Sequence, residues 1–427
     1  MSNEPFSDIP PEAPLRVNTL RVLGTNATRH SFLDSLTSHV FQASTTEEVM
    51  AKVKSVASQL QKHDIFEDIK IFVDTDHATP DSVNIVLHLK EKEKGVFETK
   101  INMGDNQAEL NGGWGIRNIF GGGESVYTNF SFGNYTRAAA EGVIETPLAG
   151  NAYVKAGIFA SGSIRDHSQI NAFKETAKSV GVRLKGWSQF GEHQIAYAIT
   201  DKDIVALQKA SSTVRAQSGS HLKHSIYHKF VRDDRNDILL PTKGHYIGLF
   251  QELAGLSSQG DVGYIKHELN ASHHQPLVEG MSFSTSARAG LLTHVSKEPS
   301  ITDRFYLGGP LSVRGFKMGG IGERDGNDAV GGEAYWAAGA SLIAAIPGLS
   351  HLPVKAHAFA NAGSIVAKTT DNTINELTQT SRTSVGFGFI FHHSIARIEA
   401  NYCIPLRYST SDLPQPKFQF GFGLNFL

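Results

Sequence analysis

From about Val96 to the last residue, apolar and polar positions alternate along the chain with a period of two. The alternation is clear at residues 281–291 and recurs near residues 126–132 and 398–404. It predicts β-strands, because successive side chains on a strand point to opposite faces. We expect about sixteen strands of roughly ten residues, a length that crosses a bilayer when the strand is tilted. The sequence therefore predicts a mostly-β protein with a transmembrane antiparallel β-barrel over residues 96–427.

The final strand indicates which face of the barrel meets lipid. Its apolar and polar or small positions alternate in the order Phe418, Gln419, Phe420, Gly421, Phe422, Gly423, Leu424, Asn425 and Phe426. A soluble sandwich or propeller would usually carry charged residues on its second face, whereas this face has only glutamine, glycine and asparagine. An apolar outside with a small, polar inside favours a membrane barrel over the soluble folds.

The segment before the barrel follows a different pattern. Residues 1–16 are Pro-rich and acidic, and we expect a disordered tail without a secretory signal. Residues 17–92 predict a compact α/β domain in the order strand, helix, helix, strand, strand. Its second helix begins near Thr45 or Thr46, carries Glu47 and Glu48 in its first turn, and repeats apolar residues at helical spacing.

Charge and cysteine content narrow the possible functions. The 427 residues carry 40 basic and 42 acidic side chains, and this formal charge of −2 argues against a nucleic-acid-binding protein. Cys403 is the only cysteine, so the chain can form neither an intramolecular disulfide nor a Cys-based zinc site. The mean hydropathy of −0.21 does not argue against a membrane barrel, because alternating strands give a weak hydropathy signal.

A long Gly-rich segment, residues 294–330, interrupts the strands and contains Val313, Arg314, Gly315 and Phe316. Loops of this length without their own structure are uncommon and usually functional, so we predict that this loop folds into the barrel. A buried guanidinium must be paired, and Arg314 is therefore expected to anchor the loop to the inner wall. Gly315 would permit a tight backbone, and Phe316 would pack beside it. The alternative is an exposed Gly-rich turn in which Arg314 is solvated.

No motif for catalysis, metal binding or cofactor binding stands out. The pairs His273-His274 and His392-His393 are neighbours on expected strands, so their side chains point to opposite faces and cannot chelate a metal together. The Gly-rich segments lack the GK[ST] sequence and the strand-to-helix context of a phosphate loop. Neither HExxH nor GxSxG occurs. We expect a protein that is not an enzyme and that has no metal and no cofactor.

Several segments resemble a known superfamily. Residues 17–92, with residues 66–69 and 83–86 in the last two strands, resemble a POTRA domain. Residues 115–124, 237–244 and 313–316 resemble the early hairpin, the mid-barrel turn and the sixth-loop signature of the POTRA-bearing outer-membrane assembly superfamily. The single POTRA-like unit, the lack of a secretory signal and the tract 332–339 resemble its mitochondrial branch, the central β-barrel subunits of the sorting and assembly machinery.

The resemblance implies insertion and folding of β-barrel precursors into the mitochondrial outer membrane, with the POTRA-like domain in the intermembrane space. The implied route is a lateral gate between the first and last barrel strands, where the β-signal of a substrate adds by strand augmentation. The first strand contributes Phe97, Thr99, Ile101 and Met103, and the last strand contributes residues 418–426. The alternative is a passive or polypeptide-secreting outer-membrane pore.

The implied partners are unfolded β-barrel precursors, accessory subunits on the cytosolic face, small intermembrane-space chaperones and membrane lipid, with no nucleic acid. The sequence departs from the superfamily at one point. Bacterial members place acidic residues on two neighbouring strands to receive the loop arginine, and Ile343 and Asn361 match those positions here. Glu399 or another inward-facing acid is left as the possible partner of Arg314.

Overall fold

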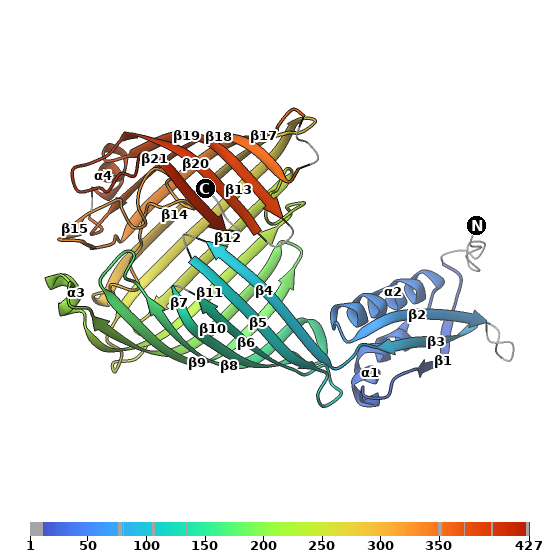
Figure 1. The fold of residues 1–427 in the computed structure, drawn as a ribbon. Helices are drawn as coiled ribbons and strands as arrows, with labels where there is room; N and C mark the ends of the chain where they lie inside the picture. The colour runs from blue at the N-terminus through green and yellow to red at the C-terminus, as the bar shows by residue number, and fades with distance from the viewer. Residues whose placement is uncertain are drawn as a thin grey trace.

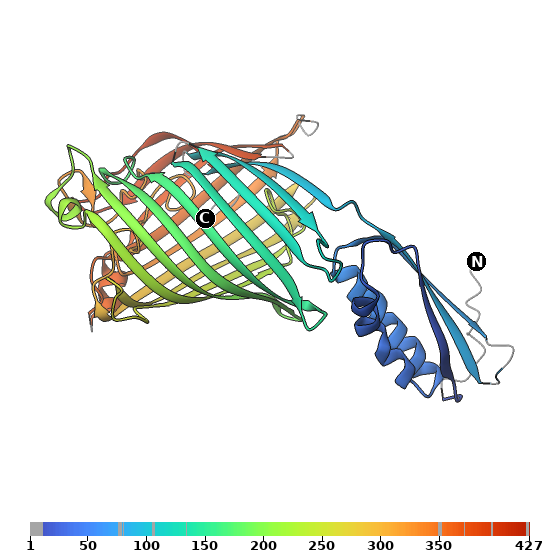
Figure 2. The same ribbon diagram turned by 90° about the horizontal axis from the view of Figure 1, so that it is seen from below.

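The computed structural model describes residues 12–75, 79, 81–104, 107–133, 135–348, 352–370, 372–393, 396–423 and 427. A small α/β domain precedes a large β-barrel and lies beyond one end of it (Figures 1 and 2). No helix in these described ranges is both long and apolar enough to cross a membrane.

The small domain is a three-stranded sheet with helices packed on one face. Its elements are β1 (Arg16–Leu23), α1 (His30–Thr37), the short 3-10 helix η1 (Ser38–Gln42), α2 (Thr46–Lys62), β2 (Phe66–Thr75) and β3 (Ser82–Glu91). The strand order is β1-β3-β2, in which β1 is parallel to β3 and β2 is antiparallel to it. This arrangement confirms the predicted POTRA fold.

Helix α2 shows why this sequence forms the domain. The hydroxyl of Thr45 accepts a hydrogen bond from the Glu48 amide, while the Glu48 carboxylate accepts one from the Ser44 amide, and together these bonds satisfy the first turn. Val49, Val53, Val56 and Leu60 are buried at helical spacing on the opposite side. They pack on the alternating apolar residues of β3, which are Val83, Ile85, Leu87 and Leu89.

The barrel is one antiparallel sheet of 16 strands, as the alternation predicted. Its strands are β4 (Gly95–Gly104), β5 (Gln107–Arg117), β6 (Ser125–Gly133), β7 (Thr136–Leu148), β8 (Asn151–Asp166), β9 (Phe173–Ser188), β10 (Gly191–Ala206), β11 (Gly219–Asp233), β12 (Gly244–Ala254), β13 (Gly263–Val278), β14 (Met281–Lys297), β17 (Ala334–Ala345), β18 (Val354–Val366), β19 (Arg382–His393), β20 (Ala396–Arg407) and β21 (Lys417–Gly423).

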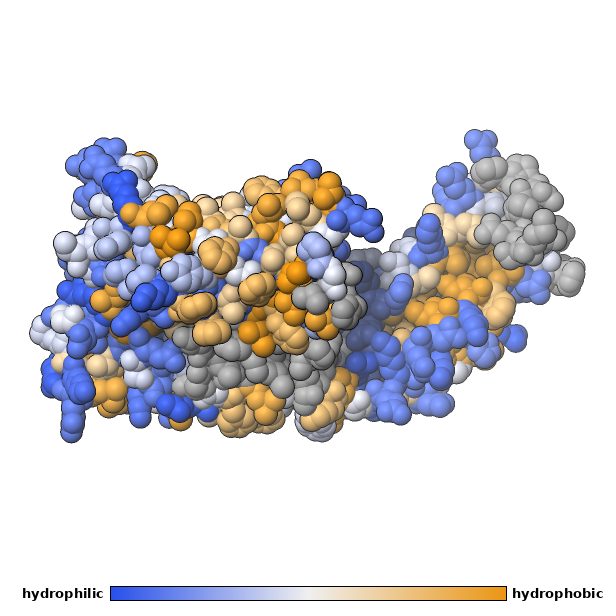
Figure 3. Space-filling model, turned by 45° about the horizontal axis from the view of Figure 1, so that its top comes forward, coloured by the Kyte–Doolittle hydropathy of each residue, from blue (hydrophilic) through white to orange (hydrophobic). Residues whose placement is uncertain are grey.

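The outer surface of the barrel is apolar and its interior is polar. Exposed aromatic and aliphatic side chains such as Ile158, Val182 and Phe389 lie on the barrel strands. Hydrophobic residues also gather on the face of the barrel that Figure 3 shows. Polar groups such as Glu399 and Asn401 are fully buried on the inner side. This distribution is the reverse of that in a soluble protein and suits a wall surrounded by lipid.

The connections on the far side from the POTRA domain carry short elements. Helix α3 (Ser212–Ala216) follows β10, and α4 (Thr373–Gln379) follows β18 (Figure 1). The long connection between β14 and β17 covers residues 298–333, because β14 continues to Lys297 before the loop begins. It contains the small hairpin of β15 (Arg324–Asp325) and β16 (Asp328–Ala329).

Candidate functional site: the inward loop and the barrel seam

The connection between β14 and β17 folds into the barrel and packs there. Leu307, Val313, Phe316 and Ile321 of this loop form a buried apolar cluster with wall residues such as Tyr264. The loop signature is therefore a packed part of the interior and differs from the exposed Gly-rich turn that was the alternative. Arg314, at the tip of the loop, is 0% exposed. Its buried positive charge is therefore stabilised only by the partners that the barrel wall supplies.

Three polar groups receive the Arg314 guanidinium. Nε and Nη2 each lie 3.2 Å from Oε2 of Glu399, and Nη1 donates to Oδ1 of Asn361 at 3.2 Å. Nη1 also donates to the backbone oxygen of Leu427 at 2.5 Å. The guanidinium lies 4.7 Å from the centre of the Phe359 ring, a cation–π arrangement.

Glu399 on β20 is thus the acid that faces Arg314, and it is shared with a second arginine. Its side chain is 0% exposed and also accepts hydrogen bonds from Arg397 and Asn401. Asn361, one of the positions matched to the bacterial acids, contributes an amide oxygen in place of a carboxylate. The other matched position, Ile343, packs with Leu240 and Ile390 and supplies no charge.

Gly315 and Phe316 are held by the last strand. Gln419 of β21 accepts a hydrogen bond from the Gly315 amide at 2.9 Å and donates one to the Phe316 carbonyl at 2.8 Å. Gly315 has φ +84°, and a Cβ atom there would lie 3.4 Å from Cys403 and Ser384. Glycine is therefore favoured by its backbone conformation, while a Cβ would meet the wall at ordinary van der Waals distance.

The loop tip also pairs with the chain that leads into β21. The Lys317 amide donates to the Leu413 carbonyl at 3.0 Å, and the Gln415 amide donates to the Gly315 carbonyl at 2.7 Å. Next to this pairing, Asp412 accepts hydrogen bonds from Arg382 at 2.9 Å and from the Gly322 amide at 2.9 Å. The inward loop is consequently bonded to the Gln419 side chain of β21 and to the backbone of the chain that leads into this strand.

Strand β21 presents its two faces as the alternation requires. Phe418 and Phe420 are 69% and 56% exposed on the outside, whereas Gln419 is 4% exposed on the inside. Leu424, Asn425 and Phe426 lie outside the described residues, as does the side chain of Phe422. Gly421 and Gly423 are in the strand, which is described for seven residues.

Strand β4 forms the other end of the sheet. Phe97 lies on it with an exposed side chain, and Thr99, Ile101 and Met103 lie on it with side chains outside the described part of the structure. The sheet order runs from β21 to β4, so these two strands are its ends, and they lie side by side at the seam (Figure 1). Among the described residues, no register of backbone pairs joins them.

The POTRA domain is joined to the barrel by the turn that follows β5. The Arg29 amide donates to the Gly121 carbonyl at 2.8 Å, and Asn118 donates to the Thr28 hydroxyl at 2.9 Å. The Arg29 guanidinium pairs with Glu124 at 2.5 Å. A Cβ on Gly121, which has φ +84°, would lie 2.5 Å from the Ala27 carbonyl. This Gly-rich turn therefore makes a close interdomain contact.

His63 lies buried in the same joint and is 4% exposed. Its ring meets that of Phe32 edge to face, with centroids 5.0 Å apart. Burial, together with the nearby Lys155, lowers the pKa of His63 to about 4. The imidazole is therefore neutral when the domains are docked at neutral pH.

Sequence reasoning identified the loop and the end strands but missed the residues that connect them. Asp412 and Arg382 had no motif to mark them, and the resemblance of residues 115–124 to the early barrel hairpin did not indicate that this turn contacts the POTRA domain. Gln419 carried a signal, because it is a polar position on the inner face of an apolar strand. That signal could have indicated a polar partner inside the barrel.

Comparison with known proteins agrees with this geometry. The Omp85 superfamily domain matches residues 118–426. The sorting and assembly machinery component 50 homologs of Mus musculus and Homo sapiens are each 32% identical, covering 95% and 91% of this chain and 89% and 85% of those proteins. A SAM50-like protein of Schizosaccharomyces pombe is 29% identical and covers 97% of this chain and 91% of its own length.

Two solved structures share the fold. BamA from Haemophilus ducreyi lacking POTRA domains 1-3 has a TM-score of 0.76 at 19% identity and covers 96% of this chain and 84% of that chain. CdiB from Acinetobacter baumannii has a TM-score of 0.56 at 14% identity, with coverage of 96% and 73%.

Together, the fold and the anchored loop define a membrane-embedded β-barrel protein with an N-terminal POTRA domain. The chain belongs to the Omp85 superfamily and, within it, to the family of sorting and assembly machinery component 50. It is an integral β-barrel of the mitochondrial outer membrane that acts in β-barrel assembly, and it is not an enzyme.

Proposed function

We propose that this protein inserts β-barrel precursors through a lateral gate between β4 and β21. The backbone groups at a sheet end need hydrogen-bond partners in lipid, and an incoming strand can supply them. The observation that carries the proposal is the seam itself. β4 and β21 are the two ends of the 16-stranded sheet, they lie side by side, and no backbone register joins them among the described residues.

The composition of β21 supports this route. Gly421 and Gly423 contribute no side chains to pack against a neighbour, which weakens a strand interior. Residues 419–426 match the β-signal pattern of polar, any, Gly, any, any, apolar, any, apolar. A precursor strand with the same pattern can take the place of β21 next to β4 and supply hydrogen-bond partners to the backbone of β4. Precursor hairpins would then grow at the seam and leave it as a new barrel.

The inward loop has a separate role in the proposal. Arg314, through Glu399 and Asn361, fixes the loop tip to β20 and β18, and Gln419 fixes it to β21. The loop thereby holds the last strand at Gln419 from inside the barrel. A packed loop in the lumen also argues against a permanently open pore, since Phe316 and Val313 are fully buried there.

The partners follow from the same route. Unfolded barrel precursors are the substrates, and the POTRA domain receives them in the intermembrane space with small chaperones. The relatives named for a sorting and assembly machinery support accessory subunits, which we place on the cytosolic face. Membrane lipid contacts the apolar outer wall, where exposed residues such as Phe389 gather.

Site-specific cross-linking tests the gate. Cys403→Ser removes the native thiol, and single cysteines are then placed on the outer face at Phe97 of β4, at Phe420 of β21 and, as a matched control, at Ile226 of β11. A precursor stalled during import and carrying one cysteine in its β-signal should cross-link at positions 97 and 420 but not at 226. Equal cross-linking at all three positions would contradict the gate.

A further inference from the structure

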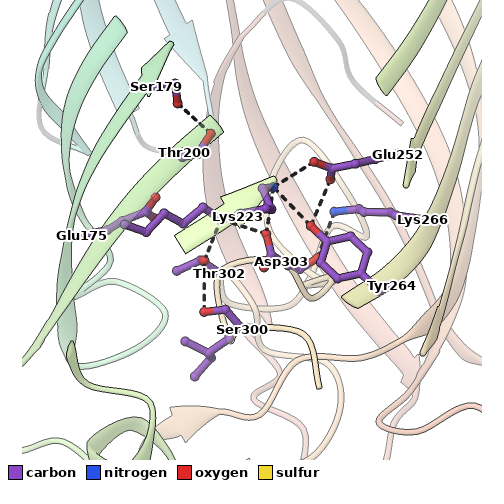
Figure 4. Close-up of polar contacts among 12 residues, drawn as sticks. Glu175, Ser179, Thr200, Lys223, Glu252, Tyr264, Lys266, Ser300, Thr302 and Asp303 are labelled. Atoms are coloured by element: carbon purple, nitrogen blue, oxygen red, sulfur yellow. Dashed lines mark hydrogen bonds and ion pairs between the residues drawn. The ribbon is translucent and has the colours of Figure 1, made fainter. Parts of the chain in front are cut away.

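The inward loop meets the barrel wall at a second place, well before its tip reaches the Arg314 site. Asp303 lies among polar side chains of β10, β11, β12 and β13, inside the barrel (Figure 4). The strands β14 and β17 separate this part of the wall from β18 and β20, where Arg314 is received. The loop therefore contacts two distinct sectors of the wall.

Three lysines from three strands hold the loop here. Asp303 Oδ1 accepts from Lys202 Nζ at 2.8 Å and lies 3.3 Å from Lys223 Nζ. Its backbone carbonyl accepts from Lys266 Nζ at 3.0 Å. Thr302, the preceding residue, accepts from Lys202 at 3.0 Å. The wall lysines bind both side-chain and backbone groups of the loop. The contact therefore holds the loop backbone in place in addition to neutralising the Asp303 carboxylate.

Asp303 is one of the two carboxylates that pair with the lysines of this cluster. Glu252 pairs with Lys223 at 2.9 Å and accepts from the Tyr264 hydroxyl at 3.0 Å. Lys202 and Asp303 are 9% and 5% exposed, so neither charge is well solvated. Removing the Asp303 carboxylate would leave Lys202 without its closest acid, and a buried unpaired charge is strongly unfavourable.

The part of the loop between Asp303 and Arg314 is buried and hydrogen-bonded to other residues of the loop, so it has little room to rearrange. Phe305 exchanges backbone hydrogen bonds with Gly332 at 2.9 Å, and the Ile321 amide donates to the Leu307 carbonyl at 3.0 Å. Leu307 and Val313 are 1% and 0% exposed. A displacement at Asp303 is therefore transmitted along the loop toward Arg314.

We propose that Asp303 is a second anchor of the inward loop, a positioning residue that ties the loop to the β10–β13 wall and keeps its tip in the Arg314 site. The loop thereby connects the long-stranded wall with β18, β20 and β21. The proposal does not depend on whether the seam opens, because it concerns the loop in the resting barrel.

The single native cysteine, Cys403, can be used to detect whether the tip of the inward loop is in its site. Cys403 is 1% exposed and lies under Gly315, whose Cβ position is 3.4 Å from the Cys403 Cβ. Because the tip covers Cys403, we expect its thiol to react with an alkylating reagent when the tip leaves this place. The rate of Cys403 alkylation by iodoacetamide, measured in the full-length protein reconstituted into phospholipid vesicles without precursor, therefore measures tip release.

Asp303→Asn removes the charge and keeps the shape, and we expect alkylation of Cys403 to accelerate about tenfold or more because a buried charge pair is broken. Only the folded fraction, identified by its heat-modifiable gel mobility, is counted. The matched control is Asp201→Asn, one residue from Lys202 but exposed on the outer face, where its carboxylate accepts from Ser220 at 2.7 Å. Its rate should stay within about twofold of the wild-type rate.

Lys202→Gln tests the same anchor from the wall and leaves Asp303 paired with Lys223, so this variant retains a folded cluster. Lys202→Gln should give a Cys403 alkylation rate between those of the wild type and Asp303→Asn. The double variant Lys202→Gln/Asp303→Asn should accelerate alkylation by less than the product of the two single accelerations, because both changes remove the same Lys202–Asp303 pair. Wild-type alkylation in Lys202→Gln or in folded Asp303→Asn would overturn the proposal. Cross-linking of precursors at the seam could still succeed in that case, so the gate would stand.

Discussion

The wall of β8–β14 and the seam of β4 and β21 differ in how firmly their strands are joined. β9 and β10 have 16 residues each and pair from Gly191↔Ser188 to Ala206↔Phe173. β4 and β21 lie side by side at the seam, and no register of backbone pairs joins them among the described residues. Opening a barrel requires breaking a whole register of backbone bonds in lipid, so a long ladder resists it far more than a short one.

The inward loop relates these two regions. Its first part binds the long-stranded wall through Asp303, and its tip binds the seam side through Arg314 and Gln419. Because β4 and β21 share no backbone register at the seam in the described part of the chain, the last strand needs contacts that come from elsewhere, and the inward loop supplies them. The loop holds the last strand from inside through Gln419, while Phe418 and Phe420 of this strand are exposed on the outer face.

The largest effect is expected from Arg314→Ala, which removes support from the seam side only. Glu399 would keep Arg397 but lose its main partner, and breaking a buried pair costs about 3–5 kcal/mol. Thermal loss of heat-modifiable gel mobility measures the barrel stability. The control Arg232→Ala removes an arginine whose pair with Asp234 is half exposed, and it should cost less than about 1 kcal/mol. Equal losses in the two variants would contradict the anchor.

Gln419→Leu should separate the loop from β21 while leaving Arg314 in place. The Gly315 amide and the Phe316 carbonyl would each lose a buried partner, at a cost of about 2–3 kcal/mol in total. Cross-links between precursor and position 420 should become more frequent, because the last strand is held less firmly. Gln275→Leu, at an exposed position of β13, is the matched control.

Gly121→Ala tests the joint of the POTRA domain, which the seam does not share. The added Cβ would meet the Ala27 carbonyl at 2.5 Å from a positive φ, so docking should weaken by about 2 kcal/mol. Protease cleavage between the two domains should accelerate, while the melting of the barrel stays unchanged. A lower barrel melting temperature with unchanged cleavage would contradict this assignment.

Acidification should weaken the same joint through His63. The pKa of the docked, buried imidazole is lowered to about 4 from the ordinary histidine value of 6.5, and undocking should raise it because Lys155 and the barrel wall then no longer lie beside the ring. Docking is therefore fully stable above pH 6.5 and loses stability as the pH falls toward 4. At pH 5 the expected loss is about 1–2 kcal/mol. Interdomain energy transfer between pH 7 and pH 5 measures it, and His63→Asn should abolish the pH dependence.

The barrel could be predicted because its information is local. Period-two alternation requires only neighbouring residues, so the strand number and the facing of Phe418, Gln419 and Phe420 follow from the sequence. The expected loop began four residues early, at 294, because Val295 and Lys297 continue β14 beyond the apolar residues that suggested its end. Strand ends are set by pairing partners, which the local pattern does not contain.

The contacts of the loop could not be predicted in the same way. Arg314 and Glu399 are 85 residues apart, and Asp303 and Lys202 are 101 apart, so only the closed barrel brings them together. The position matched to a bacterial acid, Asn361, does meet Arg314, but the charge comes from Glu399 on a strand that is not its neighbour in the sheet. Several strands face the lumen, and an acid on any of them can pair with Arg314. The loop motif alone therefore does not predict which residue carries the negative charge.

The most direct test of the account is to close the seam. Phe97→Cys and Phe420→Cys in the Cys403→Ser protein are bridged with a reducible bifunctional reagent, and precursor insertion into the membrane is timed. A control bridge joins Ile195→Cys to Ile226→Cys, on strands that are already paired. The account predicts that insertion stops with the seam bridged, resumes on reduction and continues with the control bridge. Insertion at the normal rate through a bridged seam would contradict it.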